Sequence, residues 1–402
     1  MKRILNYISV HLMELRDAIT SEFKSIFSDS GVLLLIVIAL PLYTIIYSTA
    51  YGSEVVRDVA IAVVDEDHSS SSRDFISCIA SGPNTELIYE PQSIMEAREL
   101  FYQDRVYGIV YIPHGFECNI LSSTQANIGL ILDGSHLLLY RQVLEQVASV
   151  ALAKGASIEA MRNIERGYSK PAALATVEPV KLNIHNLYNP SLGYGSFVMP
   201  SVVMVIIQQT LIIGLAMIAA RKRIRGVNIE RLSPKIIFAK YLVYLIIYSI
   251  NLLIILSIVW PAFGFPYNAN TADLAAFIAL YILASLSLGV ALAQLFKRRE
   301  APLLLLLCTS VPILLLAGVS YPREAYDKWL YMVGRLLPSS SGVDGFIAIA
   351  SRGATLCDVA TEAATLVALS IIYITLAFII NKSIYARGVQ HAQENGARHC
   401  ED

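Results

Sequence analysis

Six long apolar stretches restrict this chain of 402 residues to few architectures. They are residues 31–51, 197–220, 236–260, 273–296, 302–319 and 360–380. A helix of about 20 apolar residues crosses a hydrocarbon core of about 30 Å. Only 16% of the residues are charged, whereas globular proteins have about 25%. The sequence therefore predicts a polytopic α-helical membrane protein with six transmembrane helices.

A short basic segment between the second and third stretches indicates the orientation. Residues 221–240 read RKRIRGVNIERLSPKIIFAK, with five arginines or lysines between Arg221 and Arg231. Each would cost about 2.5–3.5 kcal/mol at the bilayer centre, and short loops rich in Lys and Arg stay in the cytoplasm. Residues 297–299 are also basic, whereas residues 261–271 carry no Lys or Arg. We therefore expect a multi-pass protein of the inner (cytoplasmic) membrane with both termini in the cytoplasm.

Residues 1–28 come before the first apolar stretch and predict a cytoplasmic amphipathic helix. Its apolar residues recur at steps of three and four along one stripe: Ile4, Ile8, Leu12, Leu15, Ile19, Phe23 and Ile26. Such a helix can lie flat on the inner leaflet, and the alternative is a helix packed on a soluble partner. Residues 29–53 follow as the first transmembrane helix, in which Pro41 predicts a kink. We find no short core with a cleavage site, so we expect a retained anchor.

Residues 54–190 change character and predict a mixed α/β domain. The expected strands are 59–64, 86–89, 106–112 and 127–132, and the expected helices are 69–80, 93–102 and 136–166. Strands that alternate with helices favour a small mixed sheet with helices packed on it. Because the domain follows a span that begins inside, we expect it to be extracytoplasmic, inserted between the first and second transmembrane helices. Cys78 and Cys118 could pair within it, or be two unrelated small side chains.

A polar run follows the first expected strand and is the only cluster that looks like a metal site. It consists of Asp65, Glu66, Asp67 and His68. A strand end followed by a helix, with Asp67 or Ser69 as N-cap, explains the same residues, and we favour capping. The sequence contains no G-x-x-x-x-G-K-[ST], H-E-x-x-H or G-x-S-x-G motif. We therefore expect no catalytic, cofactor or metal residues, and no enzyme activity, on this chain.

The rest of the chain predicts transmembrane helices 2–6 within residues 191–385 and a cytoplasmic tail at residues 386–402. Residues 321–353 are too polar to span, and they predict short external helices in the outer leaflet. The spans contain almost no ionisable residues, since Asp273, Asp358 and Glu362 lie near expected ends.

Two other classes of membrane protein fit the spans less well. An ion-coupled secondary carrier usually needs carboxylates or histidines at mid-membrane depth. A membrane-anchored receptor would use the external domain for binding and would need only one or two spans. Both remain alternatives to transport driven by an outside energy source.

Several motifs, in their order and spacing, resemble the permease subunits of type-2 ABC exporters (the ABC-2 family), in the branch with a large external domain after the first span. The motifs are VAIAVVDEDHSSSSRDF, VYGIVYIPHGFE, LILDGS, RKRIRG, SYPREAYDKWL and LLPSSSGVDGF. The resemblance implies a dimer with a second permease copy or a paralogue. It also implies cytoplasmic ABC ATPase subunits that bind ATP and Mg, and no cofactor on this chain.

The resemblance further implies a coupling loop at residues 221–235 that docks on the ATPase. Carried onto this sequence, the docking positions are Arg223, Arg225, Gly226, Val227, Asn228, Ile229, Glu230 and Arg231. Family members commonly read E-R-G-T-x-E-x-L here, and this loop lacks the threonine. The alternative is that these basic residues only set the topology.

The substrate and further partners are indicated more weakly. Spans without charged residues favour a lipophilic substrate such as a drug or lipid. A tripartite pump would add a periplasmic adaptor and an outer-membrane channel, and no nucleic-acid partner is expected.

Overall fold

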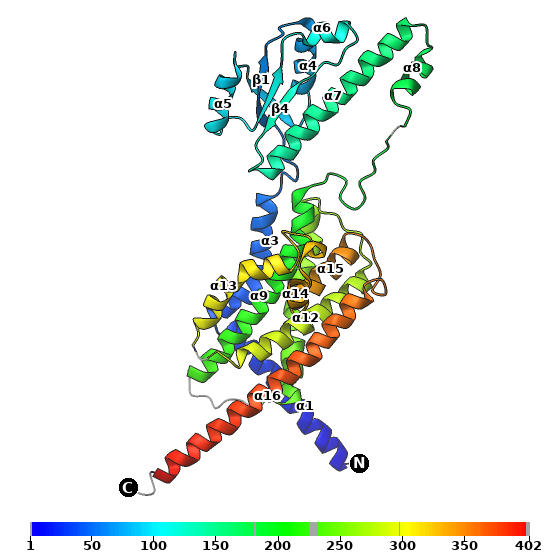
Figure 1. Cartoon of the computed structure of the whole chain (residues 1–402). Helices are drawn as coiled ribbons and strands as arrows, with labels where there is room; N and C mark the ends of the chain where they lie inside the picture. The colour runs from blue at the N-terminus through cyan, green and yellow to red at the C-terminus, as the bar shows by residue number, and fades with distance from the viewer. Residues whose placement is uncertain (1, 181, 225–231, 297, 399–402) are drawn as a thin grey trace. The chain divides into compact units, whose positions relative to one another are not determined.

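The computed structural model describes residues 2–180, 182–224, 232–296 and 298–398. It divides the chain into two compact units, which are considered separately. The α/β unit is Val55–His185, and the membrane unit is Met1–Glu54 with Asn186–Asp402. Figure 1 shows both units with their helices and strands.

The described part of the α/β unit contains a four-stranded sheet in the order β2-β1-β3-β4 (Figure 1). Its strands are β1 (Val59–Asp65), β2 (Thr85–Tyr89), β3 (Gly108–Ile112) and β4 (Gly129–Leu132). β2 and β3 run parallel to β1, with Ile61 opposite Leu87 and Gly108, and β4 runs antiparallel to β3. The mixed sheet predicted from the alternating pattern is therefore confirmed.

Helices cover both faces of this sheet. α4 (Ser70–Ala80) and α7 (Leu137–Glu165) pack on the face that includes Ile61 and Val63, and α5 (Ile94–Tyr102) packs on the face that includes Ala62 and Val64. With both faces buried, β1 needs a continuous apolar run, which the sequence VAIAVV supplies. Two short helices, α6 (Phe116–Leu121) and α8 (Lys170–Val177), were not predicted.

The regular elements of the membrane unit are all helices among the residues that the structure describes. Its elements are α1 (Lys2–Phe27), α2 (Ser30–Leu33), η1 (Leu34–Ile38), α3 (Ala39–Ala50), α9 (Tyr194–Ile224), α10 (Pro234–Ile254), η2 (Ile255–Val259), α11 (Trp260–Ala262), α12 (Thr271–Ala293), α13 (Ala301–Leu316), η3 (Arg323–Ala325), α14 (Lys328–Arg335), α15 (Pro338–Ala350) and α16 (Ala360–Arg398). α2, η1 and α3 form one run, as do α10, η2 and α11.

Among the described residues, five helical runs are long and apolar enough to cross a membrane. They are Ser30–Ala50, Tyr194–Ile224, Pro234–Ala262, Thr271–Ala293 and Ala360–Tyr385. This confirms a polytopic helical membrane protein. The predicted fifth span corresponds to α13, whose 16 residues extend about 24 Å at 1.5 Å per residue. A full crossing takes about 20 residues, so a sixth span stays a prediction.

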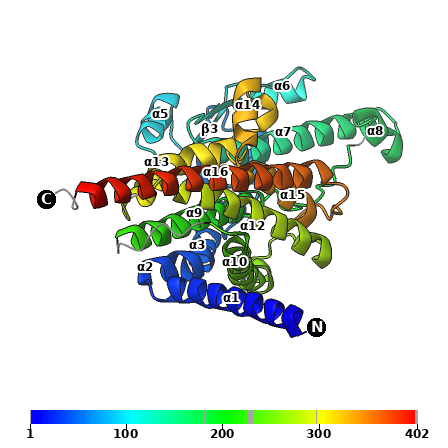
Figure 2. The ribbon, with the colours of Figure 1, turned by 90° about the horizontal axis from the view of Figure 1, so that it is seen from below.

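α9 and α12 form the centre of the membrane unit, with most of their residues buried. Figure 2 shows α9 lying between α3 and α12, with α16 beyond them. The helices approach closely where a glycine lies at the contact. A Cβ on Gly289 of α12 would lie 2.7 Å from Leu215 Cδ1, and one on Gly214 of α9 would lie 2.6 Å from Ile36 Cδ1. Small residues at such contacts are typical of membrane helices.

Two spans contain a π-helical segment, and a proline follows each segment. Pro41 follows η1 and Pro261 follows η2. A proline cannot donate a backbone hydrogen bond, and its ring clashes with the carbonyl four residues earlier. Those carbonyls belong to Val37 and Ser257, inside the two segments. The wider π turn accommodates the proline, and the irregularity expected near Pro41 takes this form.

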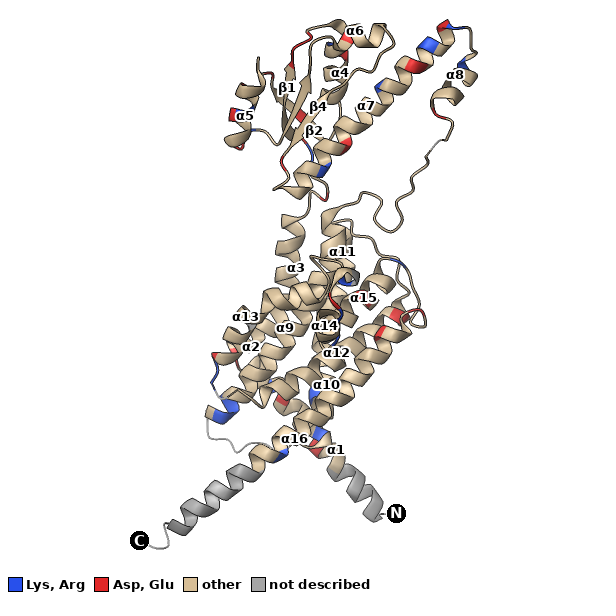
Figure 3. Cartoon of the chain, viewed as in Figure 1, with Lys and Arg blue, Asp and Glu red and all other residues tan. Residues whose placement is uncertain are grey.

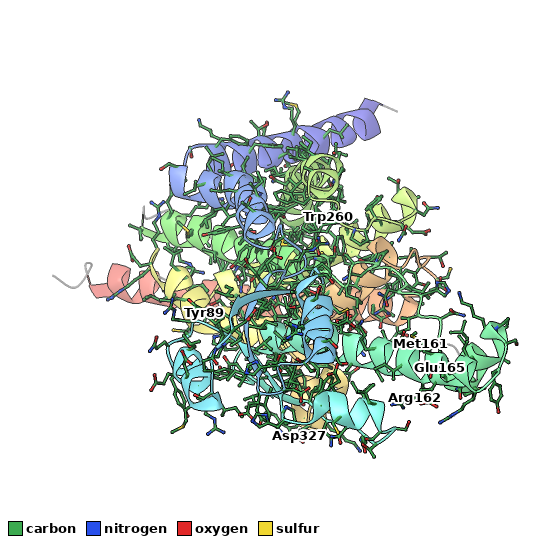
Figure 4. All side chains as sticks on the ribbon, turned by 90° about the horizontal axis from the view of Figure 1, so that it is seen from above. Tyr89, Met161, Arg162, Glu165, Trp260 and Asp327 are labelled. Carbon is green, nitrogen blue, oxygen red and sulfur yellow. The ribbon has the colours of Figure 1, made fainter. Side chains whose placement is uncertain are left out.

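Aromatic side chains pack together at the C-terminal end of the run α10–η2–α11. Trp260, labelled in Figure 4, has 1% of its surface exposed. Its ring lies edge-on to Phe265, with centroids 5.1 Å apart, and to Phe346 of α15, with centroids 6.4 Å apart. Edge-to-face pairs contribute about 0.5–1.5 kcal/mol beyond burial. This contact links the run α10–η2–α11 to α15.

Candidate functional site

The basic loop between α9 and α10 is the predicted docking site, and the structure describes its two ends. Residues 225–231 lie outside the described residues, so the predicted roles of Arg225, Gly226, Val227, Asn228, Ile229, Glu230 and Arg231 are not tested. The eighth predicted position, Arg223, is in the last turn of α9. In Figure 3 the ribbon is coloured for Lys, Arg, Asp and Glu near the ends of α9, α10 and α1.

Arg223 ties the end of α9 to the end of α12. Its Nη2 donates to the carbonyl oxygen of Gln294 at 2.8 Å, and its Nη1 donates to the carbonyl oxygen of Phe296. The last carbonyls of a helix have no partner within the helix, so a guanidinium placed there supplies one. Arg223 therefore makes an intramolecular contact beside the loop, whatever further role it has.

Two other arginines near the start of the loop, Arg221 and Arg299, both bind Asp29, the residue before α2. Arg221 Nη1 donates to Asp29 Oδ2 at 3.1 Å, and Arg299 Nη2 donates to Asp29 Oδ1 at 2.5 Å. Asp29 is 5% exposed and also caps α2 by accepting hydrogen bonds from the backbone N–H groups of Gly31 and Val32. The cluster joins α2, α9 and the segment after α12.

The charge of Asp29 follows from these contacts. Burial by itself would raise the pKa of the Asp29 carboxyl group. The hydrogen bond from Arg221, the backbone N–H of Val32 and the charge of Arg299 outweigh burial, so the pKa is lower than usual. Asp29 is therefore ionised at neutral pH and pairs with both arginines.

The far end of the loop is held by polar contacts to two other helices. The backbone N–H of Leu232 donates to Asn381 Oδ1 of α16 at 3.0 Å. Asn381 Nδ2 in turn donates to Gln294 Oε1 at 3.3 Å. Ser233 then caps α10 by accepting from the N–H of Ile236. Both ends of the loop thus connect to the end of α12.

The N-terminal helix α1 packs along α10, as Figure 2 shows. Lys240 Nζ donates to Glu22 Oε1 at 2.6 Å, with 13% and 5% of the two side chains exposed. Lys235 pairs with Glu14 nearer the loop, where both side chains are about half exposed. Two ion pairs therefore hold α1 against α10, whether or not it also lies on a leaflet.

Sequence reasoning missed Glu22 and Lys240. Glu22 interrupts the apolar stripe one residue before Phe23, and Lys240 lies inside the third apolar stretch. A charged residue at an apolar position usually has a partner, because an unpaired buried charge is costly. The sequence signal for this pair was one acidic and one basic residue, each at a position where the pattern calls for an apolar residue.

A second polar feature lies inside the membrane unit. Gln208 of α9 is fully buried, and its Oε1 accepts from the backbone N–H of Ser339 in α15 at 2.7 Å. Among the described residues, Gln208 Nε2 and the hydroxyls of Ser285, Ser339 and Ser341 are buried without a hydrogen-bond partner. Since most buried polar groups are paired, the α9–α12–α15 contact is the least satisfied part of this core.

Glu54, the last residue of the membrane unit before the α/β unit, forms hydrogen bonds with the start of α9. Its carbonyl oxygen accepts from the N–H of Tyr194 at 2.8 Å. Its carboxylate accepts from the N–H and the hydroxyl of Ser196 at 3.1 and 2.9 Å. A Cβ on Gly193 would lie 1.6 Å from Glu54 Oε2, so a side chain there would displace the Glu54 carboxylate from its bonds to Ser196. The last residue before the α/β unit is thus bonded to the start of α9.

The polar run after β1 acts in capping, as favoured from the sequence. Asp67 accepts from the N–H groups of Gly115, Phe116 and Glu117 at 2.7–3.0 Å, where α6 begins. Glu117 accepts from the hydroxyl of Ser70 at 2.6 Å and from the N–H of Ser71 at 3.1 Å, where α4 begins. Each loop therefore caps the helix of the other.

Two further contacts lie within the polar run and the helix that follows it. Ser69 is the N-cap of α4, in a capping box with Ser72. Asp65 accepts from the N–H groups of Asp67 and His68 within its own turn.

Among the described cysteines, Cys78 and Cys118 are both free thiols, so the pair left open from the sequence is not formed.

Comparison with known proteins adds an independent line of evidence. A family model described as ABC-2 family transporter protein matches residues 30–379 of the chain. The probable multidrug ABC transporter permease YbhR of Escherichia coli (strain K12) is 23% identical over 321 residues, which cover 78% of this chain and 83% of that protein. The protein of the same name from Escherichia coli O157:H7 gives the same values.

Proposed function

The chain belongs to the ABC-2 family of transporter proteins, and from this we propose that it is the membrane-spanning permease subunit of an ATP-driven exporter. The family match over residues 30–379 carries the proposal, and the similarity to a probable multidrug ABC transporter permease supports it. ATP and Mg bind to separate ABC ATPase subunits, and this chain holds no cofactor of its own. A second permease, as a copy or a paralogue, completes the membrane part.

The proposed mechanism transmits movement through the coupling loop at residues 221–235. ATP closes the ATPase dimer, and the docking positions 225–231 move with it. The contacts of Arg223, Asp29 and Asn381 support this, because they join the loop ends to α2, α12 and α16. A displacement of the loop would then shift several spans together, and a path between the two permeases opens outward.

The proposed substrate is lipophilic, such as a drug or a lipid. The support is the apolar character of the spans and the word multidrug in the name of the E. coli relative. The proposed location is the inner membrane, with both termini in the cytoplasm and the α/β unit outside. A periplasmic adaptor and an outer-membrane channel are further proposed partners.

The first test is purification of the protein in mild detergent from its native membrane. We expect an ABC ATPase subunit to co-purify and transport to require ATP. If the protein purifies alone and moves substrate without nucleotide, the ion-coupled carrier is supported instead.

The second test changes the loop in reconstituted complexes. The double variant Gly226→Ala/Glu230→Ala should keep ATP hydrolysis and lose most ATP-dependent uptake of lipophilic dyes into inside-out vesicles. Glu300→Ala is a matched control, because Glu300 is an exposed acid in another short loop of the membrane unit. Unchanged transport in the double variant would remove the assignment of the docking positions.

A further inference from the structure

A cavity of about 330 Å³ lies where the first and second spans reach the surface of the membrane unit. It is lined by Ser28, Asp29, Ser30, Arg221, Ile224 and Arg299. Two arginines and one aspartate give the lining a formal charge of +2 − 1 = +1. Its volume falls at the lower end of the range of about 300–1,000 Å³ found for ligand pockets. The cavity is therefore large enough for a small anionic group.

The two guanidinium groups are fixed and retain donors. Arg221 donates to Asp29 and to Ser28 Oγ, at 3.1 Å each, and Arg299 donates to Asp29. A guanidinium carries five N–H donors in a rigid fork that matches the oxygens of a phosphate. Arg299 has 40% of its side chain exposed, whereas Asp29 has 3%. The buried carboxylate therefore holds the arginines while part of each fork remains accessible from the cavity.

The surroundings combine this positive charge with apolar surface. Ile224 lines the cavity and is 66% exposed, and Phe27, next to Ser28, is 56% exposed. The first span begins at Ser30, beside the cavity, and the ends of a transmembrane helix reach the headgroup region of a bilayer. Basic pockets between membrane helices are suited to anionic headgroups. A ligand with a phosphate and an acyl chain fits both parts of the site.

We propose that this cavity binds the phosphate of an anionic phospholipid from the adjoining leaflet. The phosphate lies between Arg221 and Arg299, and the acyl chain lies along Ile224 and Phe27. The bound lipid fastens the start of the coupling loop to the membrane surface. The proposal depends only on the membrane setting, and not on the ATPase or the transported substrate.

The test is a lipid titration of the purified full-length protein in detergent. Phosphatidylglycerol, phosphatidylcholine and inorganic phosphate are added separately, and bound lipid is counted by native mass spectrometry. Arg299→Gln should weaken phosphatidylglycerol binding about tenfold, as loss of one charged contact predicts. Arg298→Gln is the matched control, because Arg298 is the exposed neighbour that does not line the cavity, and it should bind like the wild type.

A second variant tests the same cavity in case Arg299→Gln fails to fold. Ile224→Trp fills the cavity and leaves the Asp29 cluster intact, and it should also weaken phosphatidylglycerol binding. The melting temperature without lipid reports whether each variant is folded.

Three results would overturn the proposal. Equal losses in Arg298→Gln and Arg299→Gln would indicate diffuse attraction. Phosphate that stabilises the protein while phosphatidylglycerol adds nothing would indicate a site for a free ion. Unchanged lipid binding in Arg299→Gln, with loss of a co-purifying protein, would assign the arginine to a protein contact.

Discussion

At the residue scale, two charged pairs between α1 and α10 differ mainly in burial. Glu22 and Lys240 are almost completely enclosed, whereas Glu14 and Lys235 are about half exposed. An exposed pair contributes about 0–1 kcal/mol, because water and salt screen it. Removing one partner of a buried pair leaves an uncompensated charge and costs about 3–5 kcal/mol.

We expect Glu22→Ala to release α1 from α10, lowering the free energy of opening by about 3–5 kcal/mol. The measurement is hydrogen exchange of the α1 amides in the intact protein. Glu14→Ala is the control and should have little effect, because water and salt screen this exposed pair. The double variant Glu22→Leu/Lys240→Met should recover most of the loss, and equal effects of the two single variants would contradict this account.

The caps of the α/β unit predict a dependence on pH. The pKa of the Asp67 carboxyl group is lowered, first by Ser69; burial opposes this as the next largest effect, and the N–H groups at the start of α6 lower the pKa further. A lowered pKa in the folded state stabilises the fold above the unfolded pKa of about 3.9. This stabilisation is lost as the pH falls through the lower, folded value.

Asp67→Ala should therefore destabilise the α/β unit by about 0.5–2 kcal/mol at neutral pH. The difference from the wild type should shrink in acid, where Asp67 is protonated in both states. Hydrogen exchange of the α4 and α6 amides, corrected for its intrinsic pH dependence, measures this. Glu99→Ala on the exposed side of α5 is the control, and a difference that does not change with pH would rule out the carboxylate as the cause.

At the element scale, α15 packs on α12 through glycines that face aromatic rings. A Cβ on Gly342 would lie 2.3 Å from Tyr281 Cε2, and one on Gly345 would lie 2.0 Å from Phe277 Cζ. Both rings are fully buried and have no room to move. The same helix carries Ser339, which contacts Gln208. The position of α15 therefore depends on residues that lack a side chain.

Gly345→Ala should lower the stability of the membrane unit by about 1–3 kcal/mol, because the added methyl group overpacks the contact. Gly155→Ala in α7 is the control, since a Cβ there meets nothing within 4 Å. It should be neutral or stabilising by up to about 1 kcal/mol, as expected for alanine in a helix. Thermal unfolding in detergent compares the two, and similar melting temperatures would refute the tight contact.

The sequence predicted the elements with strong local patterns and missed those that depend on distant partners. The strand at Val59 was predictable because a buried strand needs an unbroken apolar run. α6 was not, because its six residues begin at a cap supplied by Asp67, far away in sequence. At the loop, the basic residues were predictable, but the partners of Arg221 and Arg223 were not, because only folding brings Asp29 and Gln294 close to them.

At the scale of the whole molecule, charged residues are rare within the long apolar spans and frequent in the α/β unit. The basic residues at the end of α9 predict that this end faces the cytoplasm. The α/β unit is inserted between α3 and α9, so it should lie on the opposite side.

Cysteine labelling tests this orientation. In a variant whose only cysteine is the exposed Cys118, a membrane-impermeant maleimide should label intact spheroplasts. In a cysteine-free background, Glu300→Cys should react only after the membrane is permeabilised. The reverse pattern would invert the proposed topology, and labelling of both sites in intact spheroplasts would contradict a separation by the membrane.

The hydrogen bonds of Glu54 have a consequence for the first and second spans of the membrane unit. The outgoing and returning strands of the chain are bonded to each other there, through Tyr194 and Ser196. Within the membrane unit, these bonds join the residues that follow the first span to the start of the second, so we expect these two ends to move together.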